Sequence, residues 1–438
     1  MKHLILAPLL LFPLYSFAMP ISEMVQKSVQ THPQIQIVKE SLYVERENLT
    51  QVQAGWMPTL DASYKVGPER TKTPANQRER ADLTRQEAGI TLVQNVFRGF
   101  DTVSGTDQQK ALILSAQEGV AEAANKLAVE ATSAYLEVMK TYELYQIAKE
   151  NVEVHEKYLN QIKKKVDAGV QRASDYEQTL SRLENARSLS YLSEQNYENA
   201  IYSFKRILPE DVTGSDLSKP TVGTLPASDL ATLVEMAIEN NPTVKVSDAD
   251  IIAAKAAVER SKAPYYPTAD IVAEAHWNDE VNGVGHNNNI NGIGGNNYSE
   301  SEGYSALLVL NYNLFNGFSD SAAKQANQHR LLRQQSTLAD AKRFIAANTS
   351  IAWRTYTLTE KQIEHLNKNV AASKETVKDY QKENDLGRRS IIDLLNIELE
   401  YNSARNRQTT AQYDRLVAYY QILANTGKLL EEMDIEVE

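Results

Sequence analysis

The longest regular pattern in this sequence is a heptad repeat that runs from Gln108 to Asp167. Apolar and small residues recur there at alternating steps of four and three, in two series that each step by seven. The series are Val120, Leu127, Ala134, Thr141, Ala148, His155, Ile162 and Ala124, Ala131, Val138, Tyr145, Val152, Leu159, Val166. A seven-residue period kept this long indicates a left-handed supercoil of helices. About sixty residues at 1.5 Å each predict a rod of roughly 90 Å, which must lie against other helices.

Two pairs of segments alternate apolar and polar residues with a period of two, which is typical of strands with one apolar face. The first pair is expected at 60–66 and 88–97, and the charged stretch 67–87 between them is interpreted as a solvated loop. The second pair is cleaner, and its apolar positions are Ala269, Ile271, Ala273, Ala275, Trp277, Tyr304, Ala306, Leu308, Leu310, Tyr312 and Leu314. Aromatic ends with aliphatic residues between them favour strands that face lipid. A half-buried hairpin of a soluble sheet remains the alternative.

The sequence repeats itself once. Trp56-Met57-Pro58-Thr59 matches Tyr265-Tyr266-Pro267-Thr268 at an offset of 209, and the stretch 92–100 matches 310–318 at an offset of 218. The second hairpin loop is therefore longer, in agreement with an Asn/Gly-rich insert at 281–297. Matches at a constant offset across both halves indicate a duplication.

This order predicts the domain organisation. Each repeat contains a helix, a strand hairpin, a long helix and a shorter helix. The first repeat spans 19–208, with hairpin 57–98, long helix 104–167 and helix 172–207; the second spans 229–427, with hairpin 265–316, long helix 319–386 and helix 389–426. Residues 209–228 are expected to form a linker in the equatorial region, and 428–438 a C-terminal tail.

Residues 1–18 have the features of a secretory signal peptide. Lys2 precedes an apolar run at 4–12, and the small residues Ser16 and Ala18 stand where a signal peptidase cleaves. We therefore expect an exported protein with a mature chain that begins after Ala18.

Composition narrows the possible functions. The formal net charge of −11 argues against nucleic-acid binding, which needs a basic face. With no cysteine, the chain has no disulfide, no thiol-ligated metal and no acylated N-terminal cysteine. We find no catalytic constellation and no histidine spacing typical of a metal site, so neither an enzyme nor a cofactor is expected.

The two hairpins supply four strands, which cannot close a membrane barrel alone. Open edges in lipid would leave backbone groups unsatisfied, so strands must be pooled from several chains. The expected fold is α+β: a membrane β-barrel with four strands per protomer, pooled from several copies and continued by a long α-helical coiled-coil barrel, with an internal two-fold repeat.

This arrangement resembles the TolC family of outer-membrane exit ducts over essentially the whole mature chain. The resemblance lies in the doubled order of elements, in the Leu-x-x-x-x-Phe-x-Gly-Phe stretches at 92–100 and 310–318, and in the glycine turns at Gly169 and Gly387. It implies a homotrimer in the outer membrane, with its helical barrel in the periplasm. The implied partners are the lipid bilayer, a periplasmic adaptor and an inner-membrane ABC transporter.

The resemblance also implies where the duct closes. The segment 387–396 is similar to the family's periplasmic aperture: Arg389 would hold the gate, Asp175 would be its candidate acceptor, and Asp393 would project into the bore. Two positions depart from the TolC prototype, since Asn396 replaces an aspartate and Asn384 replaces a tyrosine. The helix turns that resemble the adaptor-contacting tips are Ala168-Gly169-Val170 and Leu386-Gly387-Arg388.

Three functions fit the sequence. The first is the outer-membrane channel of a type I secretion system with a secreted protein as cargo, favoured by the missing lipid cysteine, the simple two-repeat length and the run from Phe97 to Thr102. The second is the outer-membrane component of a tripartite multidrug or small-molecule efflux pump. The third, from another class, is a coiled-coil structural or adhesive envelope protein, which has no use for doubled amphipathic hairpins.

Overall fold

The computed structural model describes residues 18–72, 81–281 and 300–435. The expected signal peptide, apart from Ala18, and the Asn/Gly-rich insert 281–297, apart from Val281, lie outside the described residues. The chain divides into two compact units. The sheet unit comprises residues 40–117 and 246–339, and the helical unit comprises the residues up to 39, 118–245 and those from 340 on.

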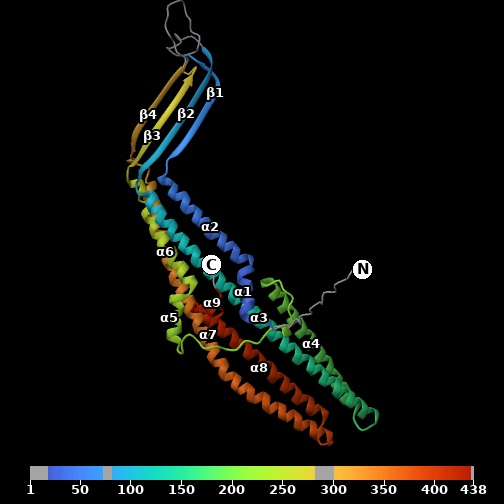
Figure 1. Ribbon diagram of the computed structural model, residues 1–438. Coiled ribbons are helices and arrows are strands. Elements are labelled where there is room, and N and C mark those ends of the chain that lie inside the picture. The colour runs from blue at the N-terminus through green and yellow to red at the C-terminus, as the bar shows by residue number, and fades with distance from the viewer. Residues whose placement is uncertain (1–17, 73–80, 282–299, 436–438) are drawn as a thin grey trace, which may run out of the picture. The chain divides into compact units, whose positions relative to one another are not determined.

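The sheet unit is built on four antiparallel strands in the order β1-β2-β3-β4. They are β1 (Thr59–Thr71), β2 (Ala81–Arg98), β3 (Thr268–Asp279) and β4 (Glu300–Asn311). Helix α2 (Pro33–Gln53) leads into β1 through the 3-10 turn η1 (Ala54–Trp56), and α6 (Pro242–Arg260) leads into β3 through η4 (Ala263–Tyr265). Figure 1 shows the strands of the two repeats side by side, with β2 and β3 joining them.

Strands β1 and β2 are longer than the alternation predicted, so the interpretation as a loop is wrong for residues 67–71 and 81–87, whereas residues 73–80 lie outside the described residues. Charged side chains pair across the two strands in this stretch. Arg70 Nε lies 2.5 Å from Asp82 Oδ1, and Arg85 Nη1 lies 3.3 Å from Glu69 Oε2. Opposite charges on neighbouring strands stabilise a sheet, which explains how a strongly charged segment stays extended.

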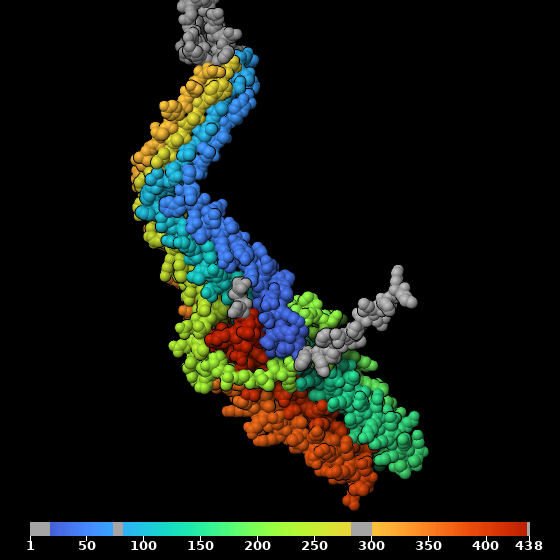
Figure 2. Space-filling view, viewed as in Figure 1, coloured from blue at the N-terminus to red at the C-terminus, as the bar shows by residue number. Residues whose placement is uncertain are grey.

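The register of the sheet separates apolar from polar residues. Directly paired residues share a face. The apolar face therefore carries Leu60, Ala62, Tyr64, Val66, Ala88, Ile90, Leu92, Ile271, Ala273, Ala275, Trp277, Tyr304, Ala306, Leu308 and Leu310. The other face is mostly polar, with four aliphatic residues on it; it carries Asp61, Ser63, Lys65, Glu87, Thr91, Glu274, His276 and Ser305 together with Val93, Val272, Leu307 and Val309. Several apolar-face side chains are strongly exposed, among them Leu60 at 69% and Leu310 at 68%. Figure 2 shows the strands as one continuous surface, blue beside yellow.

The same backbone junction leads from each hairpin into a long helix. Gly99 and Phe100 both have positive φ, at 61° and 68°, as do Gly317 and Phe318, at 56° and 65°. The phenylalanine of each junction packs edge-on against one three residues earlier, with ring centroids 5.1 Å apart in the first repeat and 5.4 Å apart in the second. The expected internal repeat is therefore confirmed in three dimensions.

Two helices of 67 residues follow these junctions: α3 (Asp101–Asp167) and α7 (Ser319–Asp385). A glycine turn connects each of them to a helix of 35 residues, α4 (Ala173–Ile207) or α8 (Ile391–Asn425). These bounds lie within three residues of those expected from the sequence. No helix in the described part of the chain is long and apolar enough to cross a membrane.

The main hydrophobic core lies in the helical unit. There α1 (Ile21–Thr31) and the short C-terminal helix α9 (Leu429–Glu432) pack against the middle of α3 and the ends of α4 and α8. Helix α5 (Leu230–Asn240) and the 3-10 turn η3 (Gly214–Asp216) complete the unit. Residues 428–435 of the expected tail are thus part of the core, since Leu429, Met433 and Ile435 are buried.

The linker between the repeats is tied to α3 by the buried hydroxyl of Tyr135. It lies 2.6 Å from the carbonyl oxygen of Met19, 2.7 Å from that of Ser218, and accepts a hydrogen bond of 2.8 Å from the Ser218 N–H. Met19 and Leu217 also form an isolated parallel bridge. One side chain therefore joins the beginning of α1, the linker and the long helix.

Candidate functional site

The two glycine turns that end α3 and α7 have the same backbone geometry. Gly169 and Gly387 both have φ of 70°, in the left-handed region that favours glycine. In the first turn the N–H groups of Gly169 and Val170 donate to the carbonyls of Val166 and Lys165. The second turn repeats this pair of bonds, from Gly387 to Asn384 and from Arg388 to Glu383. The glycine turns expected at Gly169 and Gly387 are confirmed, and both are Schellman motifs that end their helices.

Arg389 is bound to the last turn of α7 by three contacts. Its Nε lies 2.9 Å from Glu383 Oε2, and its guanidinium lies over the ring of Tyr380, 4.0 Å from the centroid. Its carbonyl accepts a hydrogen bond of 2.7 Å from Nδ2 of the buried Asn384. Asn384, where the prototype has a tyrosine, thus fixes the chain just after the turn. The contact with Glu383 raises the pKa of Arg389, so the guanidinium stays charged.

Asp393 lies in the first turn of α8, and its carboxylate closes a helix cap. Ser390 Oγ donates to Asp393 Oδ2 at 2.9 Å, and the Asp393 N–H donates to Ser390 Oγ at 3.1 Å. Asn396, one turn further on, is exposed. The cap holds the Asp393 carboxylate at a defined position at the start of α8.

The first turn has different side-chain contacts on the same backbone. At the offset of 218, Gln171 corresponds to Arg389 and Asp175 corresponds to Asp393. Gln171 Nε2 donates to Asp175 Oδ2 at 2.5 Å. Within one chain, therefore, Asp175 is bound by Gln171 and Arg389 by Glu383, and the described residues do not bring Arg389 and Asp175 together.

Both turns present exposed residues at their tips. Ala168, Gly169, Leu386, Gly387 and Arg388 are all exposed. Val170 and Leu386 are large apolar side chains that are 72% and 68% exposed. Exposed apolar side chains on a tip suit contact with another protein, and the adaptor contact of these six residues stays a prediction.

A small separate core supports the turns. Tyr158 and Ile162 of α3 pack against Ile391, Leu394 and Leu395 of α8. These side chains are almost completely buried. The start of α8, which carries Asp393, is therefore anchored on the long helix of the other repeat.

A buried polar chain adjoins this core. Gln381 Nε2 donates to the Tyr158 hydroxyl at 3.1 Å, and the hydroxyl lies 3.4 Å from Glu398 Oε1. Burial raises the pKa of Tyr158 to about 12 and also raises the pKa of Glu398. These groups, together with Glu383 and Tyr380, were missed from the sequence. The only signal in the sequence for Glu383 and Tyr380 is that a carboxylate and a ring stand within about two helical turns before Gly387.

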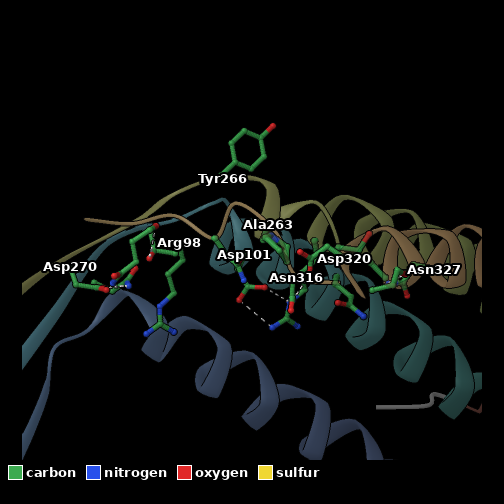
Figure 3. A pocket seen from close by; sticks show the side chains of 18 residues that line it. Arg98, Asp101, Ala263, Tyr266, Asp270, Asn316, Asp320 and Asn327 are labelled. Atoms are coloured by element: carbon green, nitrogen blue, oxygen red, sulfur yellow. Dashed lines mark hydrogen bonds and ion pairs between the residues drawn. The ribbon is translucent and has the colours of Figure 1, made fainter. Parts of the chain in front are cut away.

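The sheet unit contains a polar hollow of 620 Å³ where the strands meet the helices. Asp101 Oδ1 accepts a hydrogen bond of 2.8 Å from Nε of Arg260, and Figure 3 shows the Tyr266 ring turned away from the other labelled side chains. Asn95 Nδ2 donates to Asp270 Oδ1 at 2.5 Å at one end of the hollow. Among the residues that the structure describes, no group of three or more His, Asp or Glu side chains is arranged to hold a metal ion.

The sequence matches the family described as outer membrane efflux protein over residues 24–208 and 233–428. The chain therefore belongs to this family. The outer membrane efflux protein BepC of Brucella suis is 20% identical over 412 residues, covering 92% of this chain and 84% of the relative. The alkaline protease secretion protein AprF of Pseudomonas aeruginosa is 21% identical over 431 residues, covering 96% of this chain and 87% of the relative.

Solved structures show the same fold. The CmeC outer membrane channel of Campylobacter jejuni superposes with a TM-score of 0.80 at 12% identity, covering 93% of this chain and 86% of that chain. The resemblance seen in the sequence is confirmed, and so is the α+β class. This protein is an efflux or secretion channel of the outer membrane and not an enzyme.

Proposed function

We propose that the protein is the trimeric outer-membrane duct of a type I secretion system, through which protein cargo leaves the cell passively. An inner-membrane ABC transporter supplies the cargo and the energy, and a periplasmic adaptor connects the two. The helical barrel of the duct stands in the periplasm, and the four strands of each copy join a barrel in the membrane.

The observation that carries the channel architecture is the register of the sheet. It aligns apolar residues of all four strands on one exposed face, while the other face carries most of the polar and charged residues together with Val93, Val272, Leu307 and Val309. A sheet with lipid on one face and water on the other needs an apolar and a polar face, whereas a soluble sheet buries its apolar face. The outer strands β1 and β4 have unpaired edges that only further copies can satisfy in lipid.

Protein secretion is favoured over efflux by the similarity to AprF, which extends over nearly the whole chain. The Phe97–Thr102 run and the missing lipid cysteine support the same choice. The similarity to BepC keeps small-molecule efflux as the second candidate. Deletion of the gene should remove one or more proteins from the culture medium and leave drug susceptibility unchanged. Raised susceptibility with an unchanged set of secreted proteins would favour the efflux pump instead.

We place the gate at the second glycine turn. The bond to Glu383 occupies Nε of Arg389 and leaves Nη1 and Nη2 for an acceptor from a neighbouring chain. Asp175 of the neighbouring chain is the expected acceptor, as the resemblance to the TolC family implies. Asp393 lines the bore, where three copies supply three carboxylates.

Planar-bilayer recordings test this gate. Arg389→Ser should raise the open fraction, and Asp393→Asn should weaken cation selectivity while its side chain still accepts the Ser390 bond. Lys382→Ser is the matched control, since Lys382 is another cation of the same helix end and is paired with Asp379 at 2.9 Å. If Arg389→Ser gates like Lys382→Ser and Asp393→Asn keeps wild-type selectivity, the gate lies elsewhere.

A further inference from the structure

The two repeats are joined inside one chain by a side-chain hydrogen bond at the foot of the sheet. Asn95, near the end of β2, donates through Nδ2 to Oδ1 of Asp270, near the start of β3. The two residues are direct partners in the strand register, and Asn95 is 9% exposed. A bulge follows at once, between Asn95 and Phe97. The bond therefore marks the register of the β2–β3 pairing.

The same two residue types recur at the matching positions of the other strands. At the offset of 218, Asn95 corresponds to Asn313, which follows β4. At the offset of 209, Asp270 corresponds to Asp61 in β1. Both residues are exposed. In the described part of the chain, Asp61 has no hydrogen-bond or ion-pair partner, and Asn313 accepts only the nearby N–H of Phe315 at 3.1 Å. The chain thus carries a second donor and a second acceptor on its two free edges.

The extent of β4 points to the same missing partner. Strand β2 extends to Arg98, because the residues after Val93 no longer pair with β1 but still pair with β3. Strand β4 ends at Asn311, although its segment 312–316 corresponds to 94–98. Within the described residues of one chain, this segment has no strand beside it to pair with. Unpaired N–H and C=O groups along such an edge are a template for another strand.

From this internal repeat we infer that β4 of one copy pairs with β1 of the next copy in the register of β2 and β3, and that Asn313 donates to Asp61 across the interface. The inference rests on the ring of copies in the proposed function and adds its register. In each β2–β3 pair we replace the β2 residue by its counterpart 218 positions later and the β3 residue by its counterpart 209 positions earlier. This places Leu308 opposite Val66, Leu310 opposite Tyr64, Asn313 opposite Asp61, and Asn316 opposite Thr59.

An independent property of the strands agrees with this register. Leu310 and Tyr64 both belong to the apolar face within one chain, whereas Asp61 belongs to the polar face. The transferred register keeps the apolar face continuous from one copy to the next. A slip by one residue would place the apolar side chains of β1 on the polar side of β4.

Cysteine cross-linking tests the inference, because the chain contains no cysteine of its own. Full-length protein with Asp61→Cys and Asn313→Cys should form covalent trimers on mild oxidation, visible on a non-reducing gel and reversed by dithiothreitol. Directly opposite residues in antiparallel strands, with Cα atoms about 4.5–5.5 Å apart, are within reach of a disulfide. Either substitution alone should give no covalent trimer.

Two matched variants control the geometry. Asn95→Cys with Asp270→Cys should form the same disulfide within one chain and leave the copies unlinked. Ser63→Cys with Asn313→Cys, two positions out of register on the same face, should link poorly. In addition, Asp61→Ala should lower the temperature at which the trimer dissociates in detergent, and Ser63→Ala should not.

The outcomes separate the register from the proposed function. A trimer by native mass that links through position 63 and not 61, or through neither, overturns the register and leaves the ring intact. Equal dissociation temperatures for Asp61→Ala and Ser63→Ala overturn the hydrogen bond. A monomer by native mass overturns the ring and the register together.

Discussion

Tyr135→Phe should loosen the tie between the linker, the beginning of α1 and the long helix α3. Phenylalanine keeps the buried ring and removes only the hydroxyl, so the core keeps its packing and no large cavity forms. The hydroxyl has one hydrogen, which serves the carbonyl of Met19 or that of Ser218, and it accepts the Ser218 N–H. The substitution therefore acts on three backbone groups.

The remaining contacts decide the size of the effect. The Met19 carbonyl still accepts bonds from the Ser218 N–H at 3.2 Å and from Ser218 Oγ at 3.3 Å. Among the described residues, the Ser218 carbonyl alone is then left without its hydrogen-bond partner. One lost net hydrogen bond and one partly unsatisfied carbonyl amount to about 1–2 kcal/mol, below the cost expected if all three groups were left unpaired. A free-energy loss of this size increases the open population roughly 5- to 30-fold.

Hydrogen exchange of the peptide that contains Ser218 measures this local opening. Exchange in Tyr135→Phe should be faster by that factor, while exchange at the distant glycine turns stays unchanged. Tyr142→Phe is the matched control, because Tyr142 lies on the same helix against Gly214 of the linker and its hydroxyl has no hydrogen-bond partner among the described residues. Wild-type exchange in Tyr135→Phe, or equal acceleration in both variants, would refute the reasoning.

Two further predictions concern the long helices. Gly387→Ala should speed hydrogen exchange at the end of α7, since a side chain in the left-handed region costs about 1–2 kcal/mol and no neighbour lies within 4 Å of the added carbon. Gly119→Ala is the control: Gly119 lies inside α3 and is equally uncrowded, so alanine should slow exchange around it. The buried His155 donates from Nδ1 to the Asn151 carbonyl at 2.8 Å, and burial lowers its pKa. The unfolded chain then binds more protons than the folded chain as the pH falls below about 6.5, so acid destabilises the fold. His155→Gln should reduce the drop in thermal stability between about pH 7.5 and about pH 5.5, and an unchanged drop would contradict this assignment.

Much of the architecture could be predicted from local periodicity. The heptad spacing from Val120 to Val166 predicted one uninterrupted helix, and the structure has α3 over that whole stretch. The repeated Phe-x-Gly-Phe stretches predicted equivalent junctions, which share the same unusual backbone angles. The charged residues at 67–71 and 81–87 could not be interpreted in this way, because what extends the strands through them is their pairing with each other across the hairpin, which local periodicity does not show.

The candidate gate was predicted in position but not in its contacts. The sequence contains many carboxylates near Arg389, and nothing in their spacing selects Glu383 over Asp175. The Schellman turn selects it, because reversing the chain at Gly387 brings Arg389 back beside the last turn of α7. Likewise, the sequence shows that Asn95 and Asp270 have counterparts in Asn313 and Asp61, but only the strand order shows that one pair is internal and the other lies at free edges. Periods and turns were determined by the sequence alone, since they follow from backbone geometry over a few residues. Partners and register were decided by the tertiary structure, since they depend on which distant segments the fold places side by side.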